Sequence, residues 1–117
     1  MPQVSDEDGL VPQDVAELVR ACIDRLETLH VLLLLHATAN RTWTVRDVSR
    51  ERRSSVYGVE MSLRLLVEHG FLAREDDAYW FSPRTPELAE RTAMLSACYR
   101  ARPSAVVALI FSAGSRA

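Results

Sequence analysis

Arginine side chains cluster in the middle of the chain, before and within a stretch that has helical periodicity. Arg46, Arg50, Arg52 and Arg53 precede this stretch, and Arg64 lies on it. Guanidinium groups bind phosphate oxygens in a bidentate manner, and a guanidinium can also pair with O6 and N7 of guanine. These residue types at these positions predict contacts with the backbone and the bases of a nucleic acid.

Charge is divided unevenly along the chain, whose formal net charge is −2. From Arg41 to Arg64 six arginines stand against three acids, which gives +3, whereas the remainder has eight arginines against thirteen acids, which gives −5. A local excess of positive charge is the electrostatic pattern of a small DNA-binding protein. The alternative is a solvated helical face on which the charges fall by chance.

Residues suited to catalysis or metal binding do not occur at the required spacings. His30 and His36 do not share a helical face, and Cys22 and Cys98 lie far apart in the sequence. The four glycines form neither a phosphate-binding loop nor the sharp turn of a serine hydrolase. We expect no enzyme activity, no metal and no cofactor. The cysteines are expected to be reduced, buried thiols, with a disulfide or a redox role as the alternative.

The composition predicts a globular protein of the cytoplasm. With 117 residues, of which 48% are apolar, the chain is long enough to bury a core. The longest apolar run, residues 31–35, is too short to cross a bilayer, and no signal peptide is apparent. We expect a single domain over residues 12–112, between a flexible acidic N-terminus, residues 1–11, and a flexible tail, residues 113–117.

Two helices are expected before the arginine cluster. Apolar residues recur at three- and four-residue steps over residues 12–23, which predicts an amphipathic helix. Residues 25–37 are apolar almost all round, so the second helix is either central and buried or shares its extra face with a partner subunit. One bent helix over both segments is the alternative.

A short helix and a turn follow. Thr44 with Asp47 three positions later is typical of a capping box, and it starts a helix over residues 45–51. Arg52 and Arg53 are expected to form the turn.

A serine pair then opens a longer helix. Ser54 or Ser55 is expected to cap it, and a stripe of apolar residues continues to His69. Gly70 is expected to end the helix in a left-handed conformation.

The next segment predicts a β-hairpin. Residues 71–74 and 79–82 are rich in strand-forming residues, and the four residues between them suit a hairpin loop.

The C-terminal part predicts one long helix over residues 86–112. Thr85, Pro86 and Glu87 form a strong helix start, and Pro103 is expected to bend or restart the helix. Its last turns are apolar in an unbroken run, which at a chain end is more typical of a subunit interface than of additional core. We therefore expect a homodimer, whose interface includes Val106, Leu109, Ile110 and Phe111.

Three segments resemble the winged helix-turn-helix family of small bacterial transcriptional regulators: residues 43–48 (WTVRDV), 54–56 (SSV) and 65–72 (LLVEHGFL). The resemblance covers about 40 of the 117 residues and is most specific at the glycine that ends the second helix. It implies a fold that is mainly α with a small β-hairpin. In this fold a helix-turn-helix over residues 44–70 and a wing over residues 71–82 are flanked by N-terminal helices and a long C-terminal helix. The implied function is that of a DNA-binding transcriptional regulator that reads duplex DNA with the 54–69 helix.

The resemblance also implies two sets of DNA contacts. Arg64 is the one strong major-groove reader, while Tyr57 and Met61 can touch a thymine methyl group or a sugar. The implied base contacts are Ser55, Tyr57, Met61 and Arg64, beside Gly58. The implied phosphate contacts are Arg46, Arg50, Arg52, Arg53 and Ser54.

The hairpin loop departs from the family's pattern. It holds Glu75, Asp76 and Asp77, whereas wings that bind nucleic acid are usually basic, and Glu60 and Glu68 lie on or beside the implied reading face. Either the wing stays clear of DNA, or the chain is a winged-helix adaptor that binds another protein through its acidic wing or apolar tail, without direct DNA binding.

Overall fold

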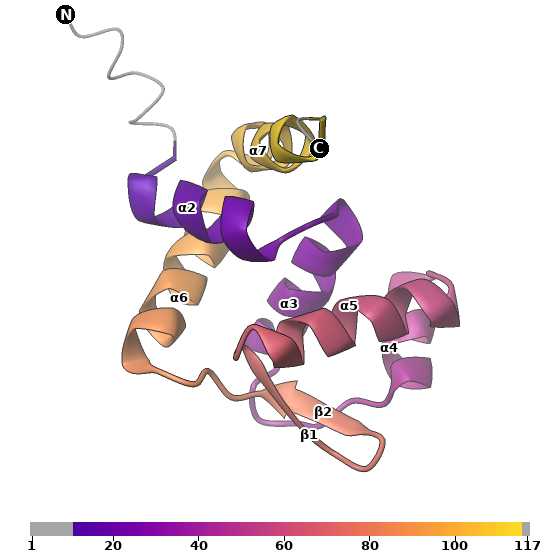
Figure 1. The fold of residues 1–117 in the computed structure, drawn as a ribbon. Coiled ribbons are helices and arrows are strands. Elements are labelled where there is room, and N and C mark those ends of the chain that lie inside the picture. Colours follow the sequence, from indigo (N-terminus) through magenta and orange to yellow (C-terminus); the bar gives the residue numbers. More distant parts are fainter. Residues whose placement is uncertain (1–10, 116–117) are drawn as a thin grey trace, which may run out of the picture. The chain divides into compact units, whose positions relative to one another are not determined.

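The computed structural model describes residues 11–115 of the chain. Within them the structure is mainly helical and contains one two-stranded antiparallel sheet, as the sequence predicted (Figure 1). No helix in this part of the chain is long and apolar enough to cross a membrane. In chain order the elements are α2 (Gln13–Cys22), α3 (Leu26–Ala37), α4 (Val45–Arg52), α5 (Val56–Glu68), β1 (Leu72–Glu75), β2 (Ala78–Phe81), α6 (Pro86–Ala101) and α7 (Pro103–Ser115).

The described residues divide into two compact units. Residues 27–89 form the middle unit, and residues 11–26 with residues 90–115 form the terminal unit. The single domain expected over residues 12–112 stays a prediction. Of the expected flexible termini, residues 1–10 and 116–117 lie outside the described residues, whereas Val11 is buried and residues 113–115 continue α7.

Local hydrogen bonds fix the start of α4. The Thr44 hydroxyl accepts from the backbone N–H of Asp47 at 3.1 Å, and the Asp47 carboxylate accepts from the backbone N–H of Thr44 at 3.3 Å. This reciprocal pair is the predicted capping box. The helix ends at Arg53, which adopts a left-handed conformation with φ 54° and turns the chain towards α5.

The bounds of α5 follow from a serine and a glycine. The Ser55 hydroxyl accepts from the backbone N–H of Gly58 at 3.0 Å, so Ser55, of the two serines considered, is the cap. Gly70 has φ +89°, a conformation that side chains with a Cβ rarely adopt. The predicted left-handed stop is therefore confirmed.

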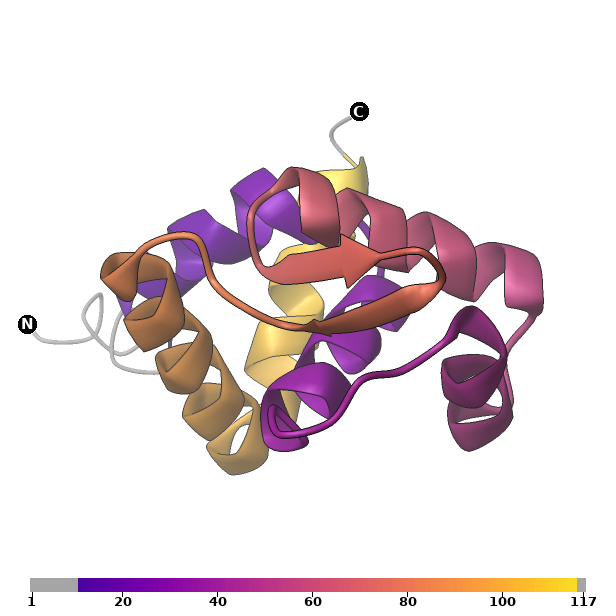
Figure 2. The same ribbon diagram turned by 90° about the horizontal axis from the view of Figure 1, so that it is seen from below.

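The core of the middle unit is formed by the inward faces of α3, α5 and the hairpin. The hairpin lies along α5, as Figure 2 shows from below. The three-and-four spacing of apolar residues on α5 puts its buried side chains on a single stripe. The apolar core side chains of this unit are Leu29, Val31, Leu32, Leu35, Trp43, Val48, Val59, Leu63, Leu66, Phe71, Leu72 and Tyr79.

The hairpin is tighter than the sequence predicted. Leu72 pairs with Phe81, and Glu75 pairs with Ala78, so the turn contains two residues instead of four. Asp76 makes the tight turn possible because it adopts a left-handed φ of 57°, which aspartate tolerates better than most residues. The Arg74 Nε also donates to the carbonyl of Asp76 at 2.8 Å, which holds the turn closed.

A third chain segment pairs with the hairpin. Trp43 and Tyr79 exchange two backbone hydrogen bonds of 2.7 Å, which form an isolated antiparallel bridge. The residue before the capping box of α4 is thereby tied to β2, so the start of the helix pair is fixed to the hairpin.

In the terminal unit α2 packs against α7 (Figure 1). Val15 and Val19 of α2 are fully buried, and Val106 and Ile110 of α7 are buried as well. Both pairs are four residues apart, which places each pair on a single helical face.

The helix expected over residues 86–112 is divided in two, and Pro103 restarts it, which was one of the two predicted effects of this proline. The Thr85 hydroxyl accepts from the backbone N–H of Leu88 at 3.1 Å and caps α6 as predicted, but α6 ends at Ala101. Pro103 has no N–H for a helical hydrogen bond and disfavours helical geometry at the residue before it. A separate helix, α7, therefore starts at Pro103 and runs to residue 115.

Candidate nucleic-acid interface

The outer face of α5 presents large apolar side chains to solvent. Tyr57 is 74% exposed and Met61 46%, and Arg64 is also exposed. These three residues follow at steps of four and three, so they form one stripe opposite the buried side chains of α5. The structure thus brings together three of the four predicted base-contact residues. The fourth, Ser55, is exposed at the start of the helix, where its hydroxyl serves as the cap.

The predicted phosphate-contact arginines are all exposed, but they differ in what they already bind. Arg50 lies 3.8 Å from the Asp47 carboxylate, and Arg52 Nη2 lies 2.8 Å from His30 Nδ1. The Arg46 and Arg53 side chains make no hydrogen bond or ion pair with the other described residues, and the same holds for Arg64. Three guanidinium groups around α4 and α5 therefore keep all their donors for a ligand.

Ser54 holds the backbone of the turn. This residue is half-buried, its hydroxyl donates to the carbonyl of Arg52 at 3.3 Å, and its own carbonyl accepts from the Ser49 hydroxyl. To contact a phosphate as predicted, the Ser54 hydroxyl would have to give up its hydrogen bond to the Arg52 carbonyl.

His30 on α3 is a part of this surface that the sequence did not reveal. Partial burial lowers the pKa of His30 below its ordinary value of 6.5, the charge of Arg52 lowers it further, and the charge of Glu27 opposes both. The neutral imidazole can accept the hydrogen bond from Arg52, since a guanidinium is only a donor. Sequence spacing within one helix could not find this pair, because its members belong to α3 and α4.

The first turn of α3 fixes the position of α5. Thr28 and Ser62 are fully buried, and their hydroxyl oxygens lie 2.9 Å apart in a hydrogen bond. Gly58 is also buried, and an added Cβ there would lie 2.9 Å from Glu27 Oε1 and 3.0 Å from the Ser55 hydroxyl oxygen. The absence of a side chain at Gly58 leaves room for these two groups.

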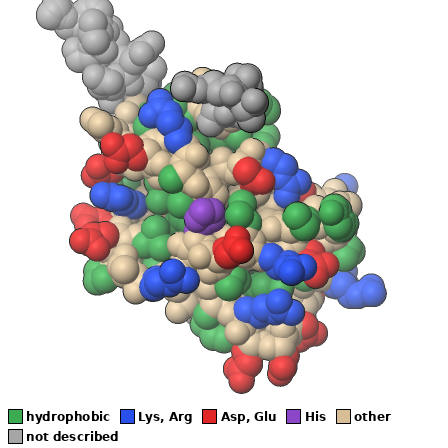
Figure 3. Space-filling model, in the orientation of Figure 1, with side chains coloured by type: hydrophobic (Ala, Val, Ile, Leu, Met, Phe, Trp, Pro, Cys, Tyr) green, Lys and Arg blue, Asp and Glu red, His purple; other side chains and the backbone are tan. Residues whose placement is uncertain are grey.

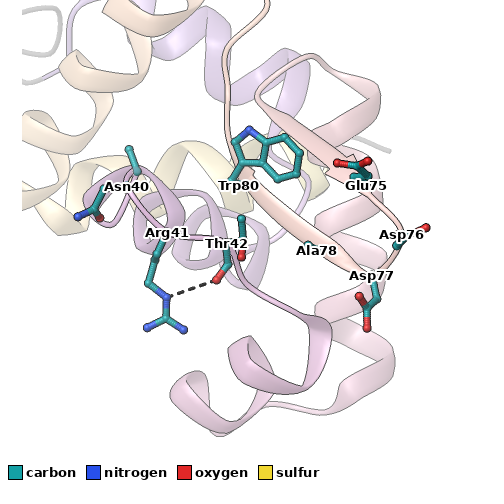
Figure 4. Close-up of a pocket in the computed structure, with 9 residues that line it drawn as sticks. Asn40, Arg41, Thr42, Glu75, Asp76, Asp77, Ala78 and Trp80 are labelled. Carbon is teal, nitrogen blue, oxygen red and sulfur yellow. Dashed lines mark hydrogen bonds between the residues drawn. The ribbon is translucent and has the colours of Figure 1, made fainter.

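The hairpin turn is acidic and exposed. Glu75, Asp76 and Asp77 project there, and Figure 3 shows carboxylates gathered at the lower edge of the middle unit, with arginine side chains above and to the right. The turn forms one side of an open hollow of about 690 Å³. Half-buried Trp80 forms its wall, and residues 39–42 face the acids from the other side (Figure 4).

Two further arginines of the middle unit are stacked on aromatic rings. The Arg41 guanidinium lies 3.7 Å from the centre of the Trp43 ring, and the Arg74 guanidinium lies 5.3 Å from that of Tyr79. Such cation–π contacts hold the guanidinium planes against the protein. Tyr79 and Trp43 are buried, so both rings belong to the core of the middle unit.

The predicted dimer residues divide into two pairs. Val106 and Ile110 are 0% and 2% exposed, so they belong to the core of the terminal unit and offer no surface to a second copy. Leu109 is half-buried and Phe111 is 62% exposed. Only the second pair is available for the predicted interface.

Neither cysteine forms a disulfide, and both are half-buried, less buried than the sequence suggested. Burial raises the pKa of both Cys22 and Cys98, and the charge of Arg102 partly offsets this for Cys98. Both are therefore poor nucleophiles at neutral pH. Within residues 11–115 no group of histidine, cysteine or acidic side chains is arranged to hold a metal ion.

Comparison of the chain with protein-family models, with curated proteins and with solved structures gives no match. The winged helix-turn-helix resemblance stays a prediction. Support for a function comes from the residues of the middle unit and their geometry.

Proposed function

We propose that the chain is a DNA-binding transcriptional regulator of the winged helix-turn-helix kind, in which α5 enters the major groove of duplex DNA. The observation that supports this most is the outer face of α5. It is exposed, and it carries Arg64, whose side chain makes no hydrogen bond or ion pair with the other described residues.

The order and lengths of the elements fit this function. A short helix, a tight turn, a second helix and a hairpin follow one another over residues 45–81. With 13 residues α5 is about 20 Å long, enough to lie in a major groove about 12 Å wide with its first two turns at the base edges. Tyr57 and Met61 lie within these two turns, and Arg64 follows at the start of the third.

Phosphate contacts follow from the unengaged guanidinium groups. Arg46 lies on α4 and Arg53 in the turn that leads to α5, and in a helix-turn-helix these two elements lie against the phosphate backbone. Arg52 would contribute less, because its guanidinium already donates to His30. The acidic turn is repelled by phosphates, so contact is made by the helix and the turn before it and not by the hairpin.

The test is a binding titration with duplex DNA selected from genomic fragments, repeated at several salt concentrations. Arg53→Ala and Arg46→Ala should weaken binding to all sequences and reduce the slope of log K against log salt by about one unit each. Arg64→Ala should weaken the selected sequence more than unrelated DNA, by a factor of about 10 or more. Arg20→Ala, an exposed arginine of α2, is the matched control and should change nothing.

Circular dichroism of each variant separates loss of contact from loss of fold. If the folded wild-type protein shifts no duplex at low salt, the proposal is wrong.

A protein-binding adaptor is the second candidate. The open hollow beside the hairpin turn favours it, because exposed carboxylates and half-buried Trp80 together suit a basic segment of a partner protein. Asp76→Asn with Asp77→Asn should then abolish capture of that partner. The same change should strengthen binding to DNA slightly, if DNA is the ligand, since it removes charge of the same sign as the phosphates.

A further inference from the structure

The exposed apolar side chains of the described residues are concentrated on α5. Of the four large hydrophobic residues that are exposed, three lie at its start or on its outer face: Val56 at 47%, Tyr57 at 74% and Met61 at 46%. Exposed apolar side chains gathered on one helix face are typical of a binding surface. On a helix that contacts bases, apolar side chains also limit which base edges the helix can recognise.

The chemistry of the major groove decides the partner of these side chains. Each base pair presents hydrogen-bond donors and acceptors there, and the only apolar group is the C5-methyl of thymine. Met61 has no hydrogen-bond donor, and Tyr57 offers a flat ring with one hydroxyl. Of the residues on this stripe, Arg64 is suited to a bidentate contact with guanine.

The spacing of the side chains sets the spacing of the bases. Tyr57 and Met61 are about 6 Å apart along the helix, and base pairs follow every ~3.4 Å, so the two residues are separated by about two base steps. Arg64 lies about 4.5 Å further on, or about one step beyond Met61. Glu68 is on the same stripe one turn later, near the end of α5.

We propose that α5 selects duplexes in which two thymines, about two steps apart, are followed by a guanine, and that the thymines are recognised by their methyl groups through Tyr57 and Met61. This inference rests on the proposed function, because it assumes that α5 enters the groove. Exposed Arg64 continues the apolar stripe of Tyr57 and Met61 on the same face of α5, and its positive charge is complementary to the phosphates and guanines of duplex DNA.

The test replaces thymine by deoxyuridine, which removes the methyl group and keeps base pairing and phosphate charge. Duplexes are first selected from a random-sequence pool, and the best of them is then made with thymine or with uracil at each position. Loss of one contacted methyl group should weaken binding about fourfold, which is the effect expected when one methyl-sized group is no longer buried. Loss of both methyl groups should weaken binding about 15-fold.

Protein variants assign each methyl group to its side chain. Met61→Ala should bind the thymine duplex more weakly and should no longer respond to uracil at one of the two positions. Tyr57→Phe keeps the ring and should keep the response at the other position, whereas Tyr57→Ala should lose it. Arg53→Ala is the matched control, because it should weaken the thymine and uracil duplexes by the same factor.

Two negative results have different meanings. Equal affinity for thymine and uracil duplexes, with tight and salt-dependent binding to both, overturns the methyl recognition and leaves the proposed function standing. Failure to bind any duplex overturns the proposed function, and the inference with it.

Discussion

At the scale of single residues, the arginines of the middle unit differ in the contacts that their guanidinium groups already make within the protein. Arg41 is stacked on Trp43 and Arg52 donates to His30, whereas Arg53 makes no side-chain hydrogen bond or ion pair with the other described residues. A guanidinium that gives up an internal bond to reach a phosphate gains less from the contact than an unengaged one. In DNA binding we therefore rank Arg53 above Arg52, although they are neighbours in sequence.

The His30–Arg52 contact can be tested by proton NMR of the histidine ring. The pKa of His30 should lie below 6.5, because partial burial and the charge of Arg52 both disfavour the imidazolium. Arg52→Ala removes one of these causes and should raise the pKa of His30. A pKa that does not change in this variant would show that the two side chains do not interact in solution.

The same shift makes stability depend on pH. Because the pKa of His30 is lower in the folded than in the unfolded chain, the unfolded chain binds more protons between the two values. The contribution of His30 to the free energy of unfolding is fully present above about pH 6.5. It decreases as the pH falls from there towards the lowered pKa. Urea unfolding between pH 5 and pH 8 should show this decrease, and His30→Gln, which does not titrate, should remove that part of it.

Gly58 gives a prediction about the contact between α5 and the Glu27 side chain of α3. Alanine is favoured over glycine within a helix by about 1 kcal/mol, but here its Cβ would lie 2.9 Å from Glu27 Oε1 and 3.0 Å from the Ser55 hydroxyl oxygen. Gly58→Ala alone should therefore gain less than this, or lose stability. In a Glu27→Ala background, where only the Ser55 hydroxyl remains close, the same change should be more favourable, as measured by urea unfolding. Equal effects in both backgrounds would contradict the close contact.

At the scale of elements, α4 depends on its cap more than on its length. It has eight residues, and Val48 is its only buried side chain among those described, so packing alone stabilises it little. The reciprocal hydrogen bonds of Thr44 and Asp47 supply part of the missing stability. The pKa of Asp47 lies below its ordinary value of 3.8. The main cause is the hydrogen bond that the carboxylate accepts from the Thr44 backbone N–H, and the second is its hydrogen bond with the Thr44 hydroxyl.

Removal of this cap should loosen α4. Thr44→Ala should lower the free energy of unfolding by about 1 kcal/mol, while Thr42→Ala, at an exposed position outside the helix, should leave it unchanged. Amide hydrogen exchange should show the loss of protection at the start of α4. The Asp47 contribution to the free energy of unfolding is present above about pH 3.8 and is lost as the pH falls through its lowered pKa. The difference between wild type and Thr44→Ala should therefore shrink in acid but not vanish, because the bond from the Asp47 backbone N–H to the Thr44 hydroxyl does not titrate.

At the scale of the whole molecule, the predicted homodimer now depends on few residues. Val106 and Ile110 are used by the terminal unit itself, which leaves Phe111 with half-buried Leu109 as the apolar surface of α7.

Light scattering after size exclusion tests the dimer directly. The wild-type protein should have twice the chain mass of 13.2 kDa, and Phe111→Glu should return it to a single chain without change in its unfolding midpoint. Val106→Glu is the informative contrast, because a charge at this buried position should unfold the terminal unit. A wild-type protein of 13.2 kDa at micromolar concentration would exclude this assembly.

Much of the fold was predictable from the sequence, because its signals are short in range. The capping box at Thr44, the serine cap of α5 and the left-handed Gly70 are each set by residues within a few positions of one another. The same reasoning placed the hairpin between α5 and α6. It misjudged the turn, because the register of two strands also depends on a left-handed Asp76 and on pairing across the sheet.

The tertiary structure decided which side chains remain available to contact a ligand or a second copy of the chain. Sequence spacing put arginines near a helix, but only the fold brought His30 on α3 within 2.8 Å of Arg52 on α4 and left Arg53 unengaged. Likewise, an apolar run at the chain end could not reveal that Val106 is used by the core while Phe111 is not. Helix caps and turns arise from hydrogen bonds between near neighbours, which a sequence records directly. Burial and pairing arise from residues far apart in the chain, and these are settled only when the elements pack.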